Sequence, residues 1–216
     1  MSSTLQTAAD GHGETLEPED VNFGKATGGK VAMWMFIAQD GMSFGGLLFA
    51  YGVLRSSAQE WPIPAEVLGI GLTAVATFLL ICSSLSMVFA VLAAQERNQA
   101  ALVRWLGVTI AGGATFLGIQ AYEYYHLVHN GVGFITSSHN GESINNLFGT
   151  TFYAVTGFHG LHVLSGVIYL TIIFRGAQKG KYTQGGTSYS PVELVGLFWH
   201  FVDLVWILVF TFIYLL

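Results

Sequence analysis

The sequence predicts an all-α polytopic membrane protein with five transmembrane helices. Of its 216 residues, 52% are hydrophobic and only 10% are charged, whereas soluble domains carry about 25% charged residues. Mean hydropathy is +0.55. Several separate apolar runs reach the ~20 residues that a transmembrane helix needs, and none alternates in the manner of a barrel strand. The net charge of −5 argues against a nucleic-acid partner.

Two regions divide the chain. Residues 1–28 are rich in Ser, Thr, Gly and acids, and we expect a flexible acidic cytoplasmic tail there. This tail does not resemble a signal peptide, because no basic segment precedes an apolar run. Residues 29–216 form the predicted transmembrane domain, with helices at about 31–54, 67–94, 102–126, 147–174 and 194–216.

The distribution of Lys and Arg predicts the orientation, because cytoplasmic connections carry an excess of both. Seven of the eight lie on one side of the five spans, and the other side carries Arg55 alone. We therefore expect a cytoplasmic N-terminus and a periplasmic C-terminus, in a multi-pass protein of the bacterial inner membrane.

The first span carries Asp40 about ten residues from its start. A carboxyl at that depth is either neutral or paired with another helix, so it is a proton or lipid-headgroup contact or a packing hydrogen bond. Gly41 and Gly45 are spaced for close helix packing. In the third span, Glu123 and His126 could pair at the membrane interface, where polar residues serve as anchors more often than in catalysis.

The fourth and fifth spans each carry a polar edge. His159 and His162 are three residues apart, about 60° on a helix, and Gly166 beside them allows another helix to approach closely. Glu193, His200 and Asp203 share an arc of roughly 80°. We expect these two edges to satisfy each other as a buried polar seam.

A metal site in this chain is not expected. The single cysteine, Cys82, excludes an internal disulfide and a paired-thiolate site, and a buried structural role is favoured for it. His159, His162 and His200 lie at one depth of the membrane only, so they do not offer separated ligand pairs. With neither a redox centre nor a nucleophile–base pair, the sequence shows no catalytic site of its own.

Three blocks carry a family resemblance: Gln120-Ala121-Tyr122-Glu123-Tyr124, Thr156 to Val163 (TGFHGLHV) and Trp199 to Trp206 (WHFVDLVW). Together they resemble subunit III of the heme-copper terminal oxidases (cytochrome c oxidase subunit 3) in its short five-helix bacterial form, over about residues 30–216. The family pattern has Ser-Glu where this chain has Gln39-Asp40.

The resemblance implies a non-catalytic subunit of a proton-pumping complex that reduces dioxygen to water, most simply with cytochrome c as electron donor. It implies heme and copper in partner subunits, contact with subunit I, subunit II and a small subunit IV, and bound structural phospholipids. The implied roles are structural, lipid-facing or supportive of proton uptake for Asp40, Glu123, His159, His162, Glu193, His200 and Asp203.

Three alternatives stay open at this point. Subunit III of a quinol oxidase and the related nitric-oxide-reductase-associated protein carry the same blocks. A stand-alone proton-coupled transporter would also place carboxylates and histidines in the membrane, but the chain shows no inverted repeat and no proline inside a span.

Overall fold

The computed structural model describes residues 28–133, 138–139, 142–143, 146–184 and 188–216. Five long helices dominate: α1 (Gly28–Ser57), α3 (Ile70–Gln95), α4 (Gln99–His129), α5 (Asn146–Gln178) and α6 (Ser190–Val209). One turn of helix, α2 (Pro64–Val67), precedes α3, and a π-helical turn, η1 (Phe210–Leu215), continues α6. β1 (Ser138–His139) and β2 (Glu142–Ser143) pair antiparallel between α4 and α5.

These helices confirm the all-helical prediction, with ends that differ by a few residues from the expected ones. α3, α4, α5, and α6 with η1, are each long and apolar enough to cross a membrane. α1 is not among them, because Gln39 and Asp40 interrupt its apolar run. The fifth crossing and the orientation of the termini stay predictions, and the N-terminal tail lies outside the described residues except for Gly28.

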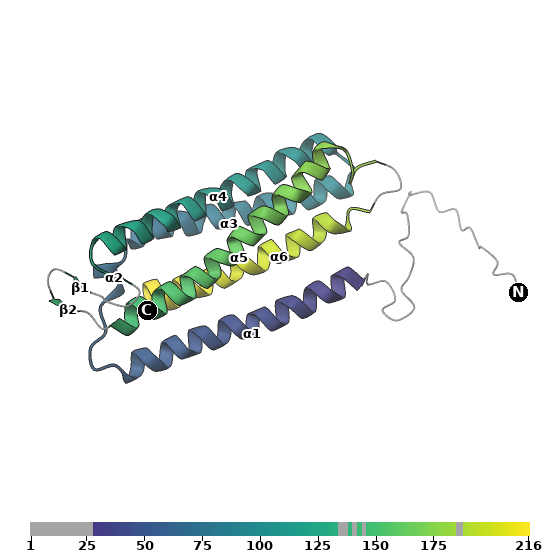
Figure 1. The fold of residues 1–216 in the computed structure, drawn as a ribbon. Helices are drawn as coiled ribbons and strands as arrows, with labels where there is room; N and C mark the ends of the chain where they lie inside the picture. Colours follow the sequence, from purple (N-terminus) through teal and green to yellow (C-terminus); the bar gives the residue numbers. More distant parts are fainter. Residues whose placement is uncertain (1–27, 134–137, 140–141, 144–145, 185–187) are drawn as a thin grey trace, which may run out of the picture.

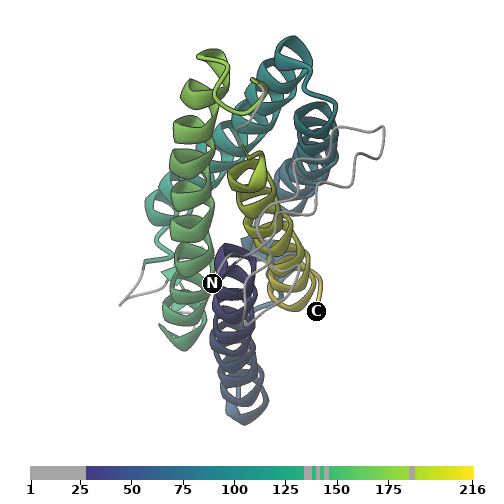
Figure 2. The ribbon, with the colours of Figure 1, turned by 90° about the vertical axis from the view of Figure 1, so that its right-hand side faces the viewer.

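α6 occupies the centre of the helix arrangement. It packs against α3, α5 and α1, while α4 packs against α3 and α5. α1 runs along one side of the molecule, next to α6 (Figure 1), and the end-on view shows it below α5 and α6 (Figure 2). This arrangement decides which helix each polar edge faces.

Trp199 of α6 fills the centre of the bundle between two glycines. A Cβ added to Gly113 of α4 would lie 2.5 Å from its ring, and one added to Gly166 of α5 would lie 2.9 Å from it. Its Nε1 donates to Oγ of Ser83 at 3.2 Å. The sequence correctly indicated a close approach at Gly166, and the group that approaches is an indole.

Two expectations about packing do not hold within the described part of the chain. A Cβ at Gly45 would find no heavy atom of that part within 4 Å, and one at Gly41 would only touch Phe201 at 3.7 Å, so these glycines make no close contact with another of the described helices. Cys82 is exposed on α3 rather than buried. Its apolar neighbours in sequence do not guarantee burial, because an outer helix face is apolar as well when it meets lipid or another membrane protein.

Candidate functional site: buried polar groups and an interhelical groove

Asp40 of α1 pairs with His162 of α5. Oδ2 of Asp40 lies 3.2 Å from Nε2 of His162, close enough for an ion pair although the groups are not aligned as a hydrogen bond. Phe44 and Phe158 pack against the imidazole, with ring centroids 5.2 and 4.6 Å away. Of the two possibilities for Asp40, the structure therefore shows the pairing with another helix.

The second ring nitrogen of His162 bonds within its own helix. Nδ1 lies 2.8 Å from the carbonyl oxygen of Phe158, and a carbonyl only accepts, so Nδ1 carries a hydrogen. Nε2 is therefore the ring nitrogen that faces the Asp40 carboxyl.

His159 lies one turn away in a wholly aromatic environment. It is fully buried, stacks on Trp206 at 4.8 Å and meets the edge of Phe116 at 5.8 Å. Neither ring nitrogen has a hydrogen-bond partner among the described residues. His159 therefore acts here as a packed aromatic ring between α4, α5 and α6.

On α6, His200 and Asp203 meet α3. Oγ of Ser84 lies 2.6 Å from Nδ1 of His200, and the same hydroxyl interacts with the carboxyl of Asp203. The expected seam between the polar edges of α5 and α6 is wrong. His162 turns instead to α1 and His200 to α3, because α6 has a helix on three sides and the part of its polar edge that carries His200 and Asp203 faces α3.

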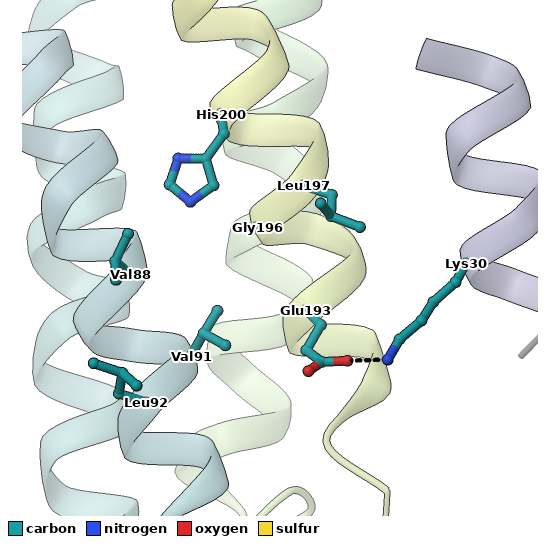
Figure 3. A pocket seen from close by; sticks show the side chains of 8 residues that line it. All are labelled: Lys30, Val88, Val91, Leu92, Glu193, Gly196, Leu197 and His200. Carbon is teal, nitrogen blue, oxygen red and sulfur yellow. Dashed lines mark ion pairs between the residues drawn. The ribbon is translucent and has the colours of Figure 1, made fainter. Parts of the chain in front are cut away.

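Glu193 joins the start of α6 to the start of α1. Its Oε2 lies 2.7 Å from Nζ of Lys30. This ion pair stands at the mouth of an apolar groove of about 350 Å³, with His200 at the other end (Figure 3). The remaining lining residues are Val88, Val91, Leu92, Gly196 and Leu197.

Glu123 is buried and does not pair with His126. Its carboxylate accepts hydrogen bonds from Thr73 at 2.9 Å, Tyr214 at 2.9 Å and Gln120 at 3.3 Å. His126 instead contacts Asn130 at 3.0 Å. Helical spacing allowed the pairing with His126, but Glu123 points into the bundle toward α3 and η1.

Sequence reasoning missed Thr73, Ser84 and Tyr214 as partners of the polar groups. Each is a hydroxyl residue inside an apolar run, and Ser and Thr there commonly bond to their own helix backbone. No signal in one sequence distinguishes the hydroxyls that reach another helix. In the part of the chain that the structure describes, no group of three or more His, Cys, Asp or Glu residues could hold a metal ion.

Two of the sequence blocks singled out above meet in space. Tyr124, from the first block, shares a 2.7 Å hydrogen bond with Thr156 at the start of the second. All three blocks lie within residues 18–216, which match the family model described as cytochrome c oxidase subunit III. The chain belongs to the cytochrome c oxidase subunit III family.

Relatives in this family are similar over most of their length. The chain is 37% identical to cytochrome c oxidase subunit 3 of Synechocystis over 218 residues, covering 100% of this chain and 84% of that protein. It is 33% identical to the Bacillus subtilis subunit 3, with coverage of 86% and 85%. It is also 34% identical to cytochrome bo(3) ubiquinol oxidase subunit 3 of Pseudomonas putida, with coverage of 86% and 84%.

Family membership confirms the resemblance found in the sequence blocks. The chain is a membrane protein and the subunit III component of an oxygen-reducing respiratory complex, and it associates there with other oxidase subunits.

Proposed function

We propose that this subunit III serves a cytochrome c-oxidising, proton-pumping terminal oxidase of a bacterial inner membrane. The observation that carries the proposal is the family match over residues 18–216, together with relatives named cytochrome c oxidase subunit 3. Quinol as donor is the second candidate, supported by the similarity to the ubiquinol oxidase subunit of Pseudomonas putida.

Within that complex, the chain packs on subunit I, near subunit II and a small subunit IV. The heme and copper belong to partner subunits. Its N-terminus is cytoplasmic and its C-terminus periplasmic. Large apolar side chains on the outside of α3, such as Phe78 and Leu85, support such contacts, since a bilayer or a neighbouring membrane subunit covers them. Its role is to support proton uptake and stability during turnover.

The groove between α3 and α6 suits a structural phospholipid. Its walls are aliphatic over most of their length, which fits an acyl chain. At its mouth, Lys30 and Glu193 place a cation and an anion side by side, and a zwitterionic headgroup presents the complementary pair of charges. Asp40, His159, His162, His200 and Asp203 serve structure in this proposal, because their contacts are to other helices.

The function is tested by an optical spectrum of the complex purified through a tag on this chain, recorded reduced minus oxidised. We expect heme a in the complex and none in the chain expressed alone. Heme b or o without heme a in the complex would favour the quinol branch. Heme bound by the isolated chain would contradict an accessory role.

The groove is tested by lipid analysis of the purified complex. Val88→Trp places a ring in the groove, whereas Leu85→Trp adds the same ring at another exposed position of α3. We expect the Val88 variant to lose one tightly held phospholipid per complex and the Leu85 variant to keep it. Equal lipid content in the two variants would contradict the assignment.

A further inference from the structure

Glu123 sits in a hydrogen-bonded cluster that three elements build. Thr73 comes from α3, Gln120 and Glu123 from α4, and Tyr214 from η1. Only 5% of Glu123 is exposed. None of its three donors carries a charge, so no cation in the cluster compensates an ionised carboxylate.

The cluster satisfies Glu123 in both of its protonation states. When the carboxyl is ionised, all three neighbours donate to it. Oγ1 of Thr73 also lies 3.2 Å from the carbonyl oxygen of Gly69. When Glu123 is protonated, its Oε1–H donates to Thr73 while the hydroxyl proton of Thr73 turns to Gly69. Gln120 and Tyr214 continue to donate to Oε2, so no group loses its partner.

A hollow of about 400 Å³ connects the molecular surface to this carboxyl. Gly69 and Leu72 of the α3 start line it, and Glu123, His126 and Asn130 line it from α4. Such a hollow has room for several waters. Glu123 is therefore the buried carboxyl that lines this hollow.

Other titratable groups surround the site. Tyr214 donates to Glu123 from η1, and Tyr124 of α4 and Tyr153 of α5 interact with it electrostatically. His126 lies on the rim of the hollow, where it stacks on Tyr122 at 6.3 Å. Tyrosines stay protonated at neutral pH, so Glu123 is the group of the cluster that can take up and release a proton.

From this geometry we propose that Glu123 is a proton-binding site in exchange with the aqueous phase through the hollow. One proton moves from hydronium in the aqueous phase to Oε1 and leaves water behind, and the hydroxyl proton of Thr73 rotates from Glu123 to the carbonyl oxygen of Gly69. Tyr214 keeps its bond, so η1 stays docked in both states. The proposal concerns the carboxyl itself and does not depend on the electron donor of the complex.

Infrared difference spectra of the intact complex at two pH values test the titration. We expect one C=O stretching band of a protonated carboxyl that is absent in Glu123→Gln and present in Glu193→Gln. The Glu193 variant is the control, because that carboxyl is ion-paired at the other end of α6. A spectrum in which Glu123→Gln loses no band would overturn the proposal.

The route is tested by deuterium exchange of the same band. A Cβ at Gly69 or at Gly71 meets no atom within 4 Å, but only Gly69 lines the hollow. We expect Gly69→Phe to slow exchange several-fold and Gly71→Phe to leave it unchanged. Equal exchange in both variants would refute entry through the hollow.

Discussion

The helices α3–α6 and the helix α1 are held in place by different physics. Within α3–α6, glycines allow contacts that no larger residue fits: a Cβ on Gly112 would lie 2.6 Å from Ser83, and one on Gly113 would lie 2.5 Å from Trp199. The stability of this part rests on shape, because a packed interior has no space to absorb an extra methyl group.

α1 combines apolar packing, through the buried Phe44 and Tyr51, with polar contacts to three other parts of the chain. Asp40 pairs with His162, Lys30 with Glu193, and Arg55 donates to the carbonyl of Leu216. Its outer face exposes large apolar side chains, with Met42 79% and Phe49 74% exposed. The same polar residues that lower the hydropathy of α1 therefore dock it on its neighbours.

We expect the largest loss of folded subunit from a substitution that disrupts the packing of α3–α6. Gly113→Leu drives a side chain into Trp199, and overpacking costs about 1–3 kcal/mol, occasionally more. We expect little folded subunit in the membrane, measured as the yield of chain in the purified complex. Gly118→Leu on the same helix is the control, because a Cβ there has no atom within 4 Å; equal yields would contradict the steric argument.

Loss of the polar contact between His200 of α6 and Ser84 of α3 should destabilise the subunit less. His200→Leu leaves the hydroxyl of Ser84 without its 2.6 Å partner on α6. Loss of a buried hydrogen-bond partner costs about 1–3 kcal/mol. We expect a lower temperature of subunit release in thermal scans of the complex. A wild-type release temperature would show that this contact contributes nothing to the packing of α6 on α3.

Two substitutions of Asp40 distinguish the loss of a hydrogen-bonding partner for His162 from the loss of the carboxyl group. Asp40→Leu leaves Nε2 of His162 unpaired, at a cost of about 1–3 kcal/mol, and should loosen α1. Asp40→Asn keeps a polar group that donates to Nε2 of the neutral imidazole, so we expect assembly close to wild type. Protease cleavage between α1 and α2 measures the difference; loss of the complex in the Asn variant would show that the carboxyl is required.

The smallest effect is expected at the rim of the groove. The side chains of Lys30 and Glu193 are 38% and 18% exposed, and ion pairs of this kind contribute about 0–1 kcal/mol. Glu193→Gln should therefore leave the thermal release of the subunit nearly unchanged. A shift as large as that of His200→Leu would show that this partly exposed ion pair contributes as much as the contact between α6 and α3.

Much of the fold followed from residue types alone. Long apolar runs predicted the five long helices, since helix is the structure that satisfies every backbone group in lipid. The blocks around Glu123, His159 and His200 indicated the family from residue types alone. α1 is less apolar than the other long helices, because it carries polar residues, and Asp40 among them contacts another helix.

The pairing of polar groups could not be predicted in the same way. Helical periodicity states that His200 and Asp203 share an edge, but the edge faces α3 because α6 lies in the centre, and no spacing within α6 encodes that position. Glu123 likewise turned from His126, three residues away, to Tyr214, which is 91 residues away.

By itself, the sequence determined the helices, their family and the polar residues that the membrane makes costly to leave unpaired. Only the tertiary structure decided the partners, placing Asp40 with His162, His200 with Ser84, and Glu123 with Thr73 and Tyr214. The physical reason is that the angle around a helix is a local property of the chain, whereas the neighbour at that angle depends on how all the helices pack.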